Sequence, residues 1–94
     1  PLGKYGRMRL RYLKEHRSCT YTALLLSGKL YDDLHDADET AQRMLDQLIP
    51  QMAKDADVTE EMKASDPMRW IGMMNSIKAQ VEEIILKNVV FFSF

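Results

Sequence analysis

Residues 66–90 read DPMRWIGMMNSIKAQVEEIILKNVV, and this stretch decides the fold. Its apolar residues recur every three or four positions, which is the period of one face of an α-helix. Asp66 is a typical N-cap residue, and Pro67 takes the first helical position, where its missing N–H has no partner to lose. We therefore expect a helix over 67–90, about 35 Å long, as the spine of the domain. Its core stripe comprises Trp70, Met73, Met74, Ile77, Val81, Ile84, Ile85 and Asn88.

Two shorter helices are predicted before residue 30. Over residues 2–16, Tyr5, Met8 and Tyr12 fall on one face, and Arg9 lies beside them, where its aliphatic stem can cover the apolar side while its charge reaches water. Residues 20–28 are predicted to form a short, mostly buried helix. We expect its start to be capped by Ser18 or Thr20 and its end by Gly28 in the left-handed conformation.

The longest helix is predicted over residues 29–54, starting at Lys29 or Leu30. Pro50 lies inside this pattern and removes a backbone donor, which predicts a kink near 46–50 or a break there. Thr59 then has the features of an N-cap for a short helix ending at Ala64. The core stripe of the long helix comprises Leu34, Ala37, Ala41, Met44, Leu45, Leu48, Ile49 and Met52.

The chain has no alternating strand pattern and no hairpin turn signal, so we predict an all-α fold. The expected architecture is a single compact domain over residues 1–94, with four to five helices and the long C-terminal helix as its spine. Residues 1–3 are compatible with either a tag remnant or native sequence. The apolar tail at 91–94 is expected to pack on the domain, with a homodimer through this tail as the alternative.

Cysteine content and hydropathy limit the compartment. The only cysteine, Cys19, has no partner for an internal disulfide, and the longest apolar run is far shorter than the roughly 18 residues of a membrane span. We therefore expect a cytoplasmic protein that does not enter a membrane. Cys19 is expected to be buried and inert, although His16 nearby offers the alternative of an activated thiol.

Charge is unevenly distributed along the chain. Residues 1–17 hold six Lys or Arg residues against Glu15, a net charge of +5, whereas residues 32–66 hold eleven acidic residues against three basic ones, a net charge of −8. On the first helix, one row of cations lies opposite the apolar face, and such a row can follow a nucleic-acid backbone. The alternative is an ordinary solvated surface, or one that neutralises acids of the same chain. The candidate nucleic-acid-binding residues are Lys4, Arg7, Arg11 and Lys14.

The acidic residues of the long helix form a second candidate surface. Such a face can imitate phosphates and bind a protein that acts on nucleic acid, or it can simply keep the chain in solution. The same acids argue against a helix-turn-helix over 20–45, because they would repel DNA. His35 among them suggests metal ligands, but one imidazole on a single helix does not complete a coordination sphere, so no metal or other cofactor is expected. The candidate interaction residues are Asp32, Asp33, Asp36 and Glu39.

Three segments together resemble a known family. They are GKYGRMR at 3–9 followed by YLKEH at 12–16, LLLSGKLY at 24–31, and DPMRWIGMMN at 66–75. Shorter matches occur at 48–53 and 82–84. The chain is similar over nearly its whole length to the TnpV family of small transposon-encoded proteins. Members often carry an extra segment before the first motif, and the Phe-rich end is atypical of them.

The resemblance implies an accessory protein of a bacterial mobile genetic element. The sequence contains no catalytic motif, so we expect this protein to be non-enzymatic. The resemblance provides no catalytic residues to carry over. It favours contact with DNA or with the proteins that act on mobile DNA. The basic first helix is the candidate surface for sequence-nonspecific contact with nucleic acid. The alternative is a protein-interaction module or inhibitor that binds a nuclease, a recombinase or a defence protein of the CRISPR type through the acidic face.

Overall fold

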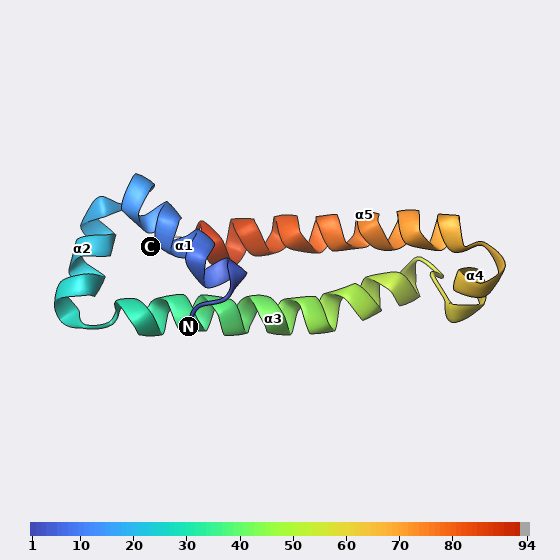
Figure 1. Ribbon diagram of the computed structural model, residues 1–94, viewed down its shortest axis with the longest axis horizontal. Helices are drawn as coiled ribbons and strands as arrows, with labels where there is room; N and C mark the ends of the chain where they lie inside the picture. The colour runs from blue at the N-terminus through green and yellow to red at the C-terminus, as the bar shows by residue number, and fades with distance from the viewer. Residues whose placement is uncertain (93–94) are drawn as a thin grey trace.

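Two long antiparallel helices, α3 (Leu30–Asp55) and α5 (Pro67–Ile85), run side by side along the molecule (Figure 1). The short helix α4 (Glu60–Ser65) joins them at one end. At the other end, α1 (Lys4–His16) packs on α3, and α2 (Ser18–Ser27) connects these two helices. The computed structural model describes residues 1–92. It contains no strand over that range, and the predicted all-α fold with a long C-terminal helix is confirmed.

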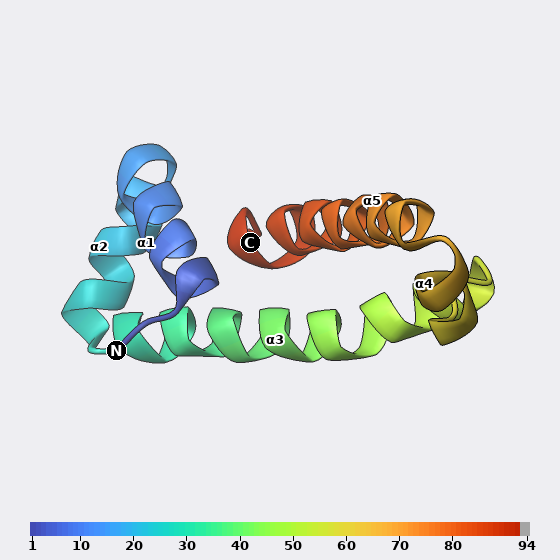
Figure 2. The same cartoon turned by 45° about the vertical axis from the view of Figure 1, so that its right-hand side comes forward.

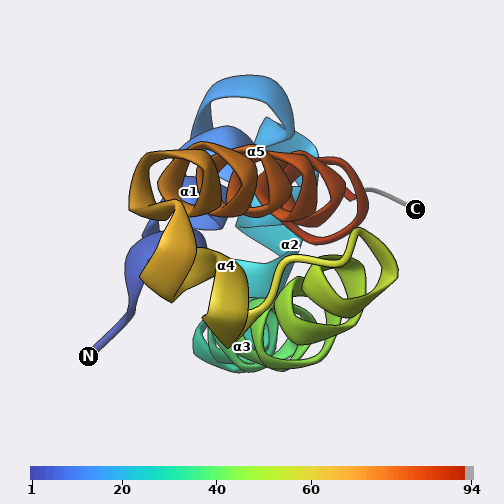
Figure 3. The ribbon, with the colours of Figure 1, turned by 90° about the vertical axis from the view of Figure 1, so that its right-hand side faces the viewer.

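The helical hairpin makes the molecule long and narrow, with dimensions of 55 × 21 × 19 Å. Its radius of gyration is 16.7 Å, against about 12 Å for a spherical domain of this length. A view along the long axis shows α3 and α5 as two layers, with α1 and α2 behind them (Figure 3). Because the molecule is about two helices thick, few side chains are fully enclosed. The buried apolar residues are Leu13, Leu34, Ala37, Ala41, Val58, Ile77, Val81, Ile85 and Val90.

Local sequence signals set most of the helix ends. The hydroxyl of Thr59 accepts a hydrogen bond from the Met62 N–H at 3.1 Å, and the Asp66 carboxylate accepts one from the Arg69 N–H at 3.3 Å. Gly28 ends α2 with a φ of 75°, a left-handed conformation that glycine adopts without strain. The predicted caps at Thr59, Asp66 and Gly28 are confirmed.

The prediction of a mostly buried helix over 20–28 is wrong. None of the residues of α2 is buried, and Leu25 and Leu26 are 53% and 81% exposed. Cys19, which we expected to be buried, is also exposed. The helix lies across the end of the hairpin (Figure 1), so only one of its sides meets the rest of the protein.

The predicted cap of α2 is also wrong. The helix begins at Ser18, so its N-cap position is Arg17, which makes no side-chain capping bond. The α1 helix ends only one residue earlier, and Arg17 therefore serves as the C-cap of α1 and the N-cap of α2 at once. This short junction leaves no room for a separate Ser or Thr cap.

Pro50 bends α3 without interrupting it. The helix continues from Leu30 to Asp55 through the proline, so the predicted alternative of a break is wrong. Figure 1 shows the last turns of α3 tilting toward α5, as expected where the Asp46 carbonyl has lost its helical donor. The bend brings the end of α3 toward α4.

The end of the last helix differs from a regular α-helix. The α-helix stops at Ile85, and residues Leu86–Val90 form a π-helical turn, labelled η1, in which the Phe91 N–H donates to the Leu86 carbonyl at 2.8 Å. Val90 is fully buried by this turn. Of the predicted stripe, Ile84 and Asn88 are exposed and lie outside the core.

The Phe-rich tail packs only in part. The Phe91 ring lies 5.1 Å from the ring of Tyr12, yet Phe91 and Phe92 remain 46% and 47% exposed. Residues 93 and 94, and with them the last phenylalanine, lie outside the described residues. No helix within residues 1–92 is both long and apolar enough to cross a membrane.

Candidate nucleic-acid interface

A carboxylate from α3 holds the start of α1. Asp38 accepts hydrogen bonds from the backbone N–H groups of Gly3, at 2.8 Å, and Gly6, at 2.7 Å. Gly3 occupies the N-cap position and has no side chain to satisfy these donors, so Asp38 takes over the capping role from another helix. Gly6 makes this possible, because a Cβ there would come within 3.0 Å of the Leu34 carbonyl oxygen and of the Asp38 carboxyl carbon.

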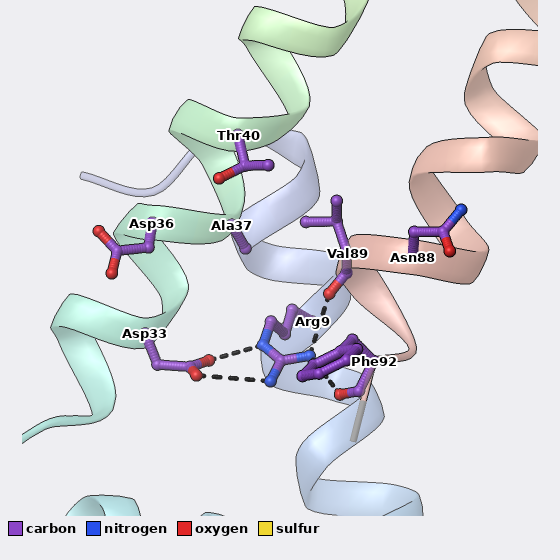
Figure 4. Close-up of a pocket in the computed structure, with 8 residues that line it drawn as sticks. All are labelled: Arg9, Asp33, Asp36, Ala37, Thr40, Asn88, Val89 and Phe92. Atoms are coloured by element: carbon purple, nitrogen blue, oxygen red, sulfur yellow. Dashed lines mark hydrogen bonds and ion pairs between the residues drawn. The ribbon is translucent and has the colours of Figure 1, made fainter. Parts of the chain in front are cut away.

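Arg9 fixes the middle of α1 against α3 and against residues 89–92 at the end of the last helix (Figure 4). Its Nε donates to Asp33 Oδ1 at 2.6 Å, and its Nη2 lies 3.4 Å from Oδ2 of the same carboxylate. Its Nη1 donates to the carbonyls of Val89, Val90 and Phe92 at 2.9–3.1 Å. Arg9 is 4% exposed, so the prediction that its charge reaches water is wrong. The carbonyls at the end of the last helix attract the guanidinium into the interior.

The pocket beside Arg9 has a volume of about 190 Å³. Figure 4 shows the guanidinium of Arg9 between the Asp33 carboxylate and the backbone of Val89 and Phe92, where its donors are already in use. This region therefore joins α1 and α3 to residues 89–92. Its lining residues are Arg9, Asp33, Asp36, Ala37, Thr40, Asn88, Val89 and Phe92.

Lys4, the first residue of the predicted cation row, is paired within the protein. Its Nζ lies 2.8 Å from Glu82 Oε1 on α5, and this hydrogen bond raises the pKa of the lysine above its ordinary value. The pKa of the adjacent Tyr5 is also raised, mainly by burial and then by the negative charge of Glu82. Lys4 remains exposed, but its charge is already compensated.

The other three candidate cations lie together on the outer side of α1. Arg7, Arg11 and Lys14 line one shallow depression of about 410 Å³ with Leu10 and Glu15. Within residues 1–92, none of the three forms an ion pair with a carboxylate. The charges of these cations are therefore available to an external anion.

Two weaker contacts lie at the two ends of this set of three cations. Arg7 Nη1 lies 3.4 Å from the Leu2 carbonyl, and Lys14 Nζ lies 5.7 Å from the centre of the Tyr21 ring. Neither contact neutralises the cation. We call Arg7, Arg11 and Lys14 the basic row.

The structure divides the candidate acidic face. Asp33 turns inward to Arg9, and Glu39 bonds to His35 with 2.6 Å between Oε1 and Nε2. Asp32 and Asp36 are exposed. The part of the chain that the structure describes contains no group of three or more His, Cys, Asp or Glu residues placed to hold a metal ion.

The alternative of a His16–Cys19 pair is not seen among the described contacts. The His16 Nε2 lies 3.9 Å from Glu15 Oε2, and its ring lies 5.7 Å from that of Tyr12. Cys19 belongs to the exposed surface of α2. These positions do not support an activated thiol.

Comparison with known proteins identifies one family. A family model described as "Transposon-encoded protein TnpV" matches residues 1–90 of the 94-residue chain. No curated protein and no solved structure matches the chain.

Proposed function

The chain belongs to the TnpV family of transposon-encoded proteins, and we propose that it is a non-enzymatic accessory protein that binds nucleic acid without sequence specificity. The proposal rests on the basic row, which combines three exposed cations without carboxylate partners among the described residues. Family membership makes nucleic acid a plausible partner, because a transposon is itself DNA. Family membership alone assigns no biochemical activity to this chain.

The length of the basic row fits a phosphate backbone. Arg7 and Lys14 are seven residues apart, so the row spans about 10 Å of helix. Over the same distance along the duplex axis, one strand of B-DNA carries about three phosphates. We infer that Arg7, Arg11 and Lys14 each meet one phosphate, and that Lys4 contributes less because Glu82 already holds it.

The basic row is held in place by contacts on the opposite side of α1. Asp38, Asp33 and the chain-end carbonyls bind groups that the row does not use. The row is therefore presented on a rigid helix, and binding does not have to order it first. A rigid row of cations binds phosphates more tightly than a flexible one, but it does not recognise the base sequence.

A fluorescence-anisotropy titration with a short DNA duplex at 50 mM salt tests the proposal. The variant Arg7→Ala/Arg11→Ala/Lys14→Ala should bind at least tenfold more weakly than the wild type, because three phosphate contacts are lost. The matched control is Arg43→Ala/Lys54→Ala/Lys78→Ala, which removes the same charge from exposed positions on α3 and α5 and should bind like the wild type. Equal losses in the two variants would show that net charge alone decides binding.

Binding of a nucleic-acid-acting protein through the acidic face is the second candidate. It is supported by the exposure of Asp32 and Asp36, which form no ion pair among the described residues. In that case the wild type fails to bind the duplex at 50 mM salt. The variant Asp32→Asn/Asp36→Asn/Glu39→Gln then loses a nuclease or recombinase partner that the basic-row variant keeps.

A further inference from the structure

The α2 helix presents an uncharged surface at the end of the molecule. Its sequence, SCTYTALLLS, contains no charged residue, although 29% of the chain is charged. None of its residues is buried, and Leu26 is 81% exposed. Leaving apolar surface in water is unfavourable, so this surface favours a partner.

One side of α2 forms a continuous shallow depression of about 440 Å³. Figure 2 shows this helix at the extreme end of the hairpin, opposite α4. Its position leaves space for a second molecule to approach along the long axis. The residues that line the depression are Ser18, Cys19, Thr22, Ala23 and Leu26.

We propose that this surface binds α2 of a second copy of the chain in an antiparallel, two-fold symmetric arrangement. The charges on either side of the helix favour this arrangement. Residues 11–17 hold Arg11, Lys14 and Arg17 against Glu15, a net charge of +2. Residues 29–36 expose Asp32 and Asp36 against Lys29, a net charge of −1, because the third aspartate of this segment is paired with Arg9. Antiparallel pairing places the basic flank of one copy near the acidic flank of the other, while parallel pairing places like charges together.

The uncharged surface of α2 also favours a second copy over a strongly charged partner. A partner with a basic or acidic surface would find no countercharge on Ser18–Ser27 and would leave its own charges desolvated. A second α2 helix is uncharged in the same way and buries apolar side chains on both sides. An isologous contact of this type closes as a dimer.

Symmetry determines which residues face each other. The lining residues extend from Ser18 to Leu26, so the two-fold axis passes close to Thr22. Ser18 of one copy then lies opposite Leu26 of the second copy, and the two Thr22 side chains meet at the axis. This register gives the proposal a specific geometric consequence.

The size of the surface limits the affinity. A ten-residue helix is about 15 Å long, and an interface built on it is smaller than the roughly 800 Å² per partner of a standard stable complex. We therefore expect a weak dimer, with a Kd on the order of 100 µM. Such a dimer forms only where the chain is concentrated.

Sedimentation equilibrium from 10 µM to 1 mM, without nucleic acid, tests the dimer. Leu26→Glu should weaken dimerisation at least tenfold, because it places a carboxylate within the apolar contact. Met68→Glu, on α5 at the far end of the molecule and 76% exposed, is the matched control and should dimerise like the wild type. Both replaced side chains face solvent in the monomer, and equal helicity by circular dichroism verifies that both variants fold.

Disulfide trapping tests the register. In a Cys19→Ser background, Thr22→Cys should give a covalent dimer when copper phenanthroline and air supply the oxidant that accepts two electrons from the two thiols. Asn75→Cys in the same background, exposed on α5, should react at least tenfold more slowly. The proposal fails if the wild type is monomeric at 1 mM, if Leu26→Glu dimerises normally, or if the two cysteine variants cross-link equally. A monomeric chain that instead binds phosphatidylcholine vesicles through Leu26 would assign the surface to lipid.

Discussion

At the scale of single residues, Arg9 connects three segments that are far apart in the sequence. Its buried guanidinium joins a carboxylate of α3 to three carbonyls at the chain end. The sequence indicates that Arg9 is exceptional, because it lies beside the apolar face of α1. It does not indicate the partners of Arg9. Asp33 is 24 residues away, and the carbonyls of residues 89–92 belong to the backbone, which every residue has, so the sequence does not mark them.

Replacing Arg9 by methionine should lower the free energy of unfolding by about 3 kcal/mol. The substitution keeps a long side chain but leaves Asp33 and the carbonyls without their donor, and breaking a buried pair of this type is costly. Urea denaturation of the wild type and Arg9→Met measures the effect. Arg11→Met, two residues away on the exposed side of α1, is the control and should change stability by no more than about 0.5 kcal/mol. Similar values for both variants would contradict the structural role of Arg9.

At the scale of elements, three helix ends with local caps were predictable, whereas the start of α1, which is completed from a distance, was not. Thr59, Asp66 and Gly28 act within their own helices, and the sequence identified each. The cap of α1 comes from Asp38, which is 32 to 35 residues away from the N–H groups it binds. For α2, apolar composition predicted burial, but its place at the end of the hairpin prevents it.

Two glycine substitutions test the contact between α1 and α3. Gly72→Ala should raise the free energy of unfolding by about 0.5–1 kcal/mol, because alanine is the better helix former and nothing lies within 4 Å of the new Cβ. Gly6→Ala should have the opposite sign, because the same methyl group would press against Asp38 and the Leu34 carbonyl. Thermal unfolding of both variants provides the comparison. Stabilisation by both alanines would mean that α1 does not approach α3 this closely.

At the scale of the whole molecule, folding pairs some charged residues of each candidate surface and leaves others exposed. Of the four predicted cations, Lys4 pairs with Glu82, while Arg7, Arg11 and Lys14 share one exposed surface. Of the four predicted acids, Asp33 turns inward and Glu39 pairs with His35. The sequence supplied the candidate residues, but only the packing of α1 on α3 and α5 separates paired charges from available ones.

The salt dependence of DNA binding tests the central claim, that the basic row meets phosphates, most directly. Each phosphate neutralised on B-DNA contributes about −0.9 to the slope of log K against log salt, so three contacts predict a slope of about −2.7 for the wild type. The variant lacking Arg7, Arg11 and Lys14 should give a slope close to zero. A wild-type slope near zero, or equal slopes for the two proteins, would contradict the account.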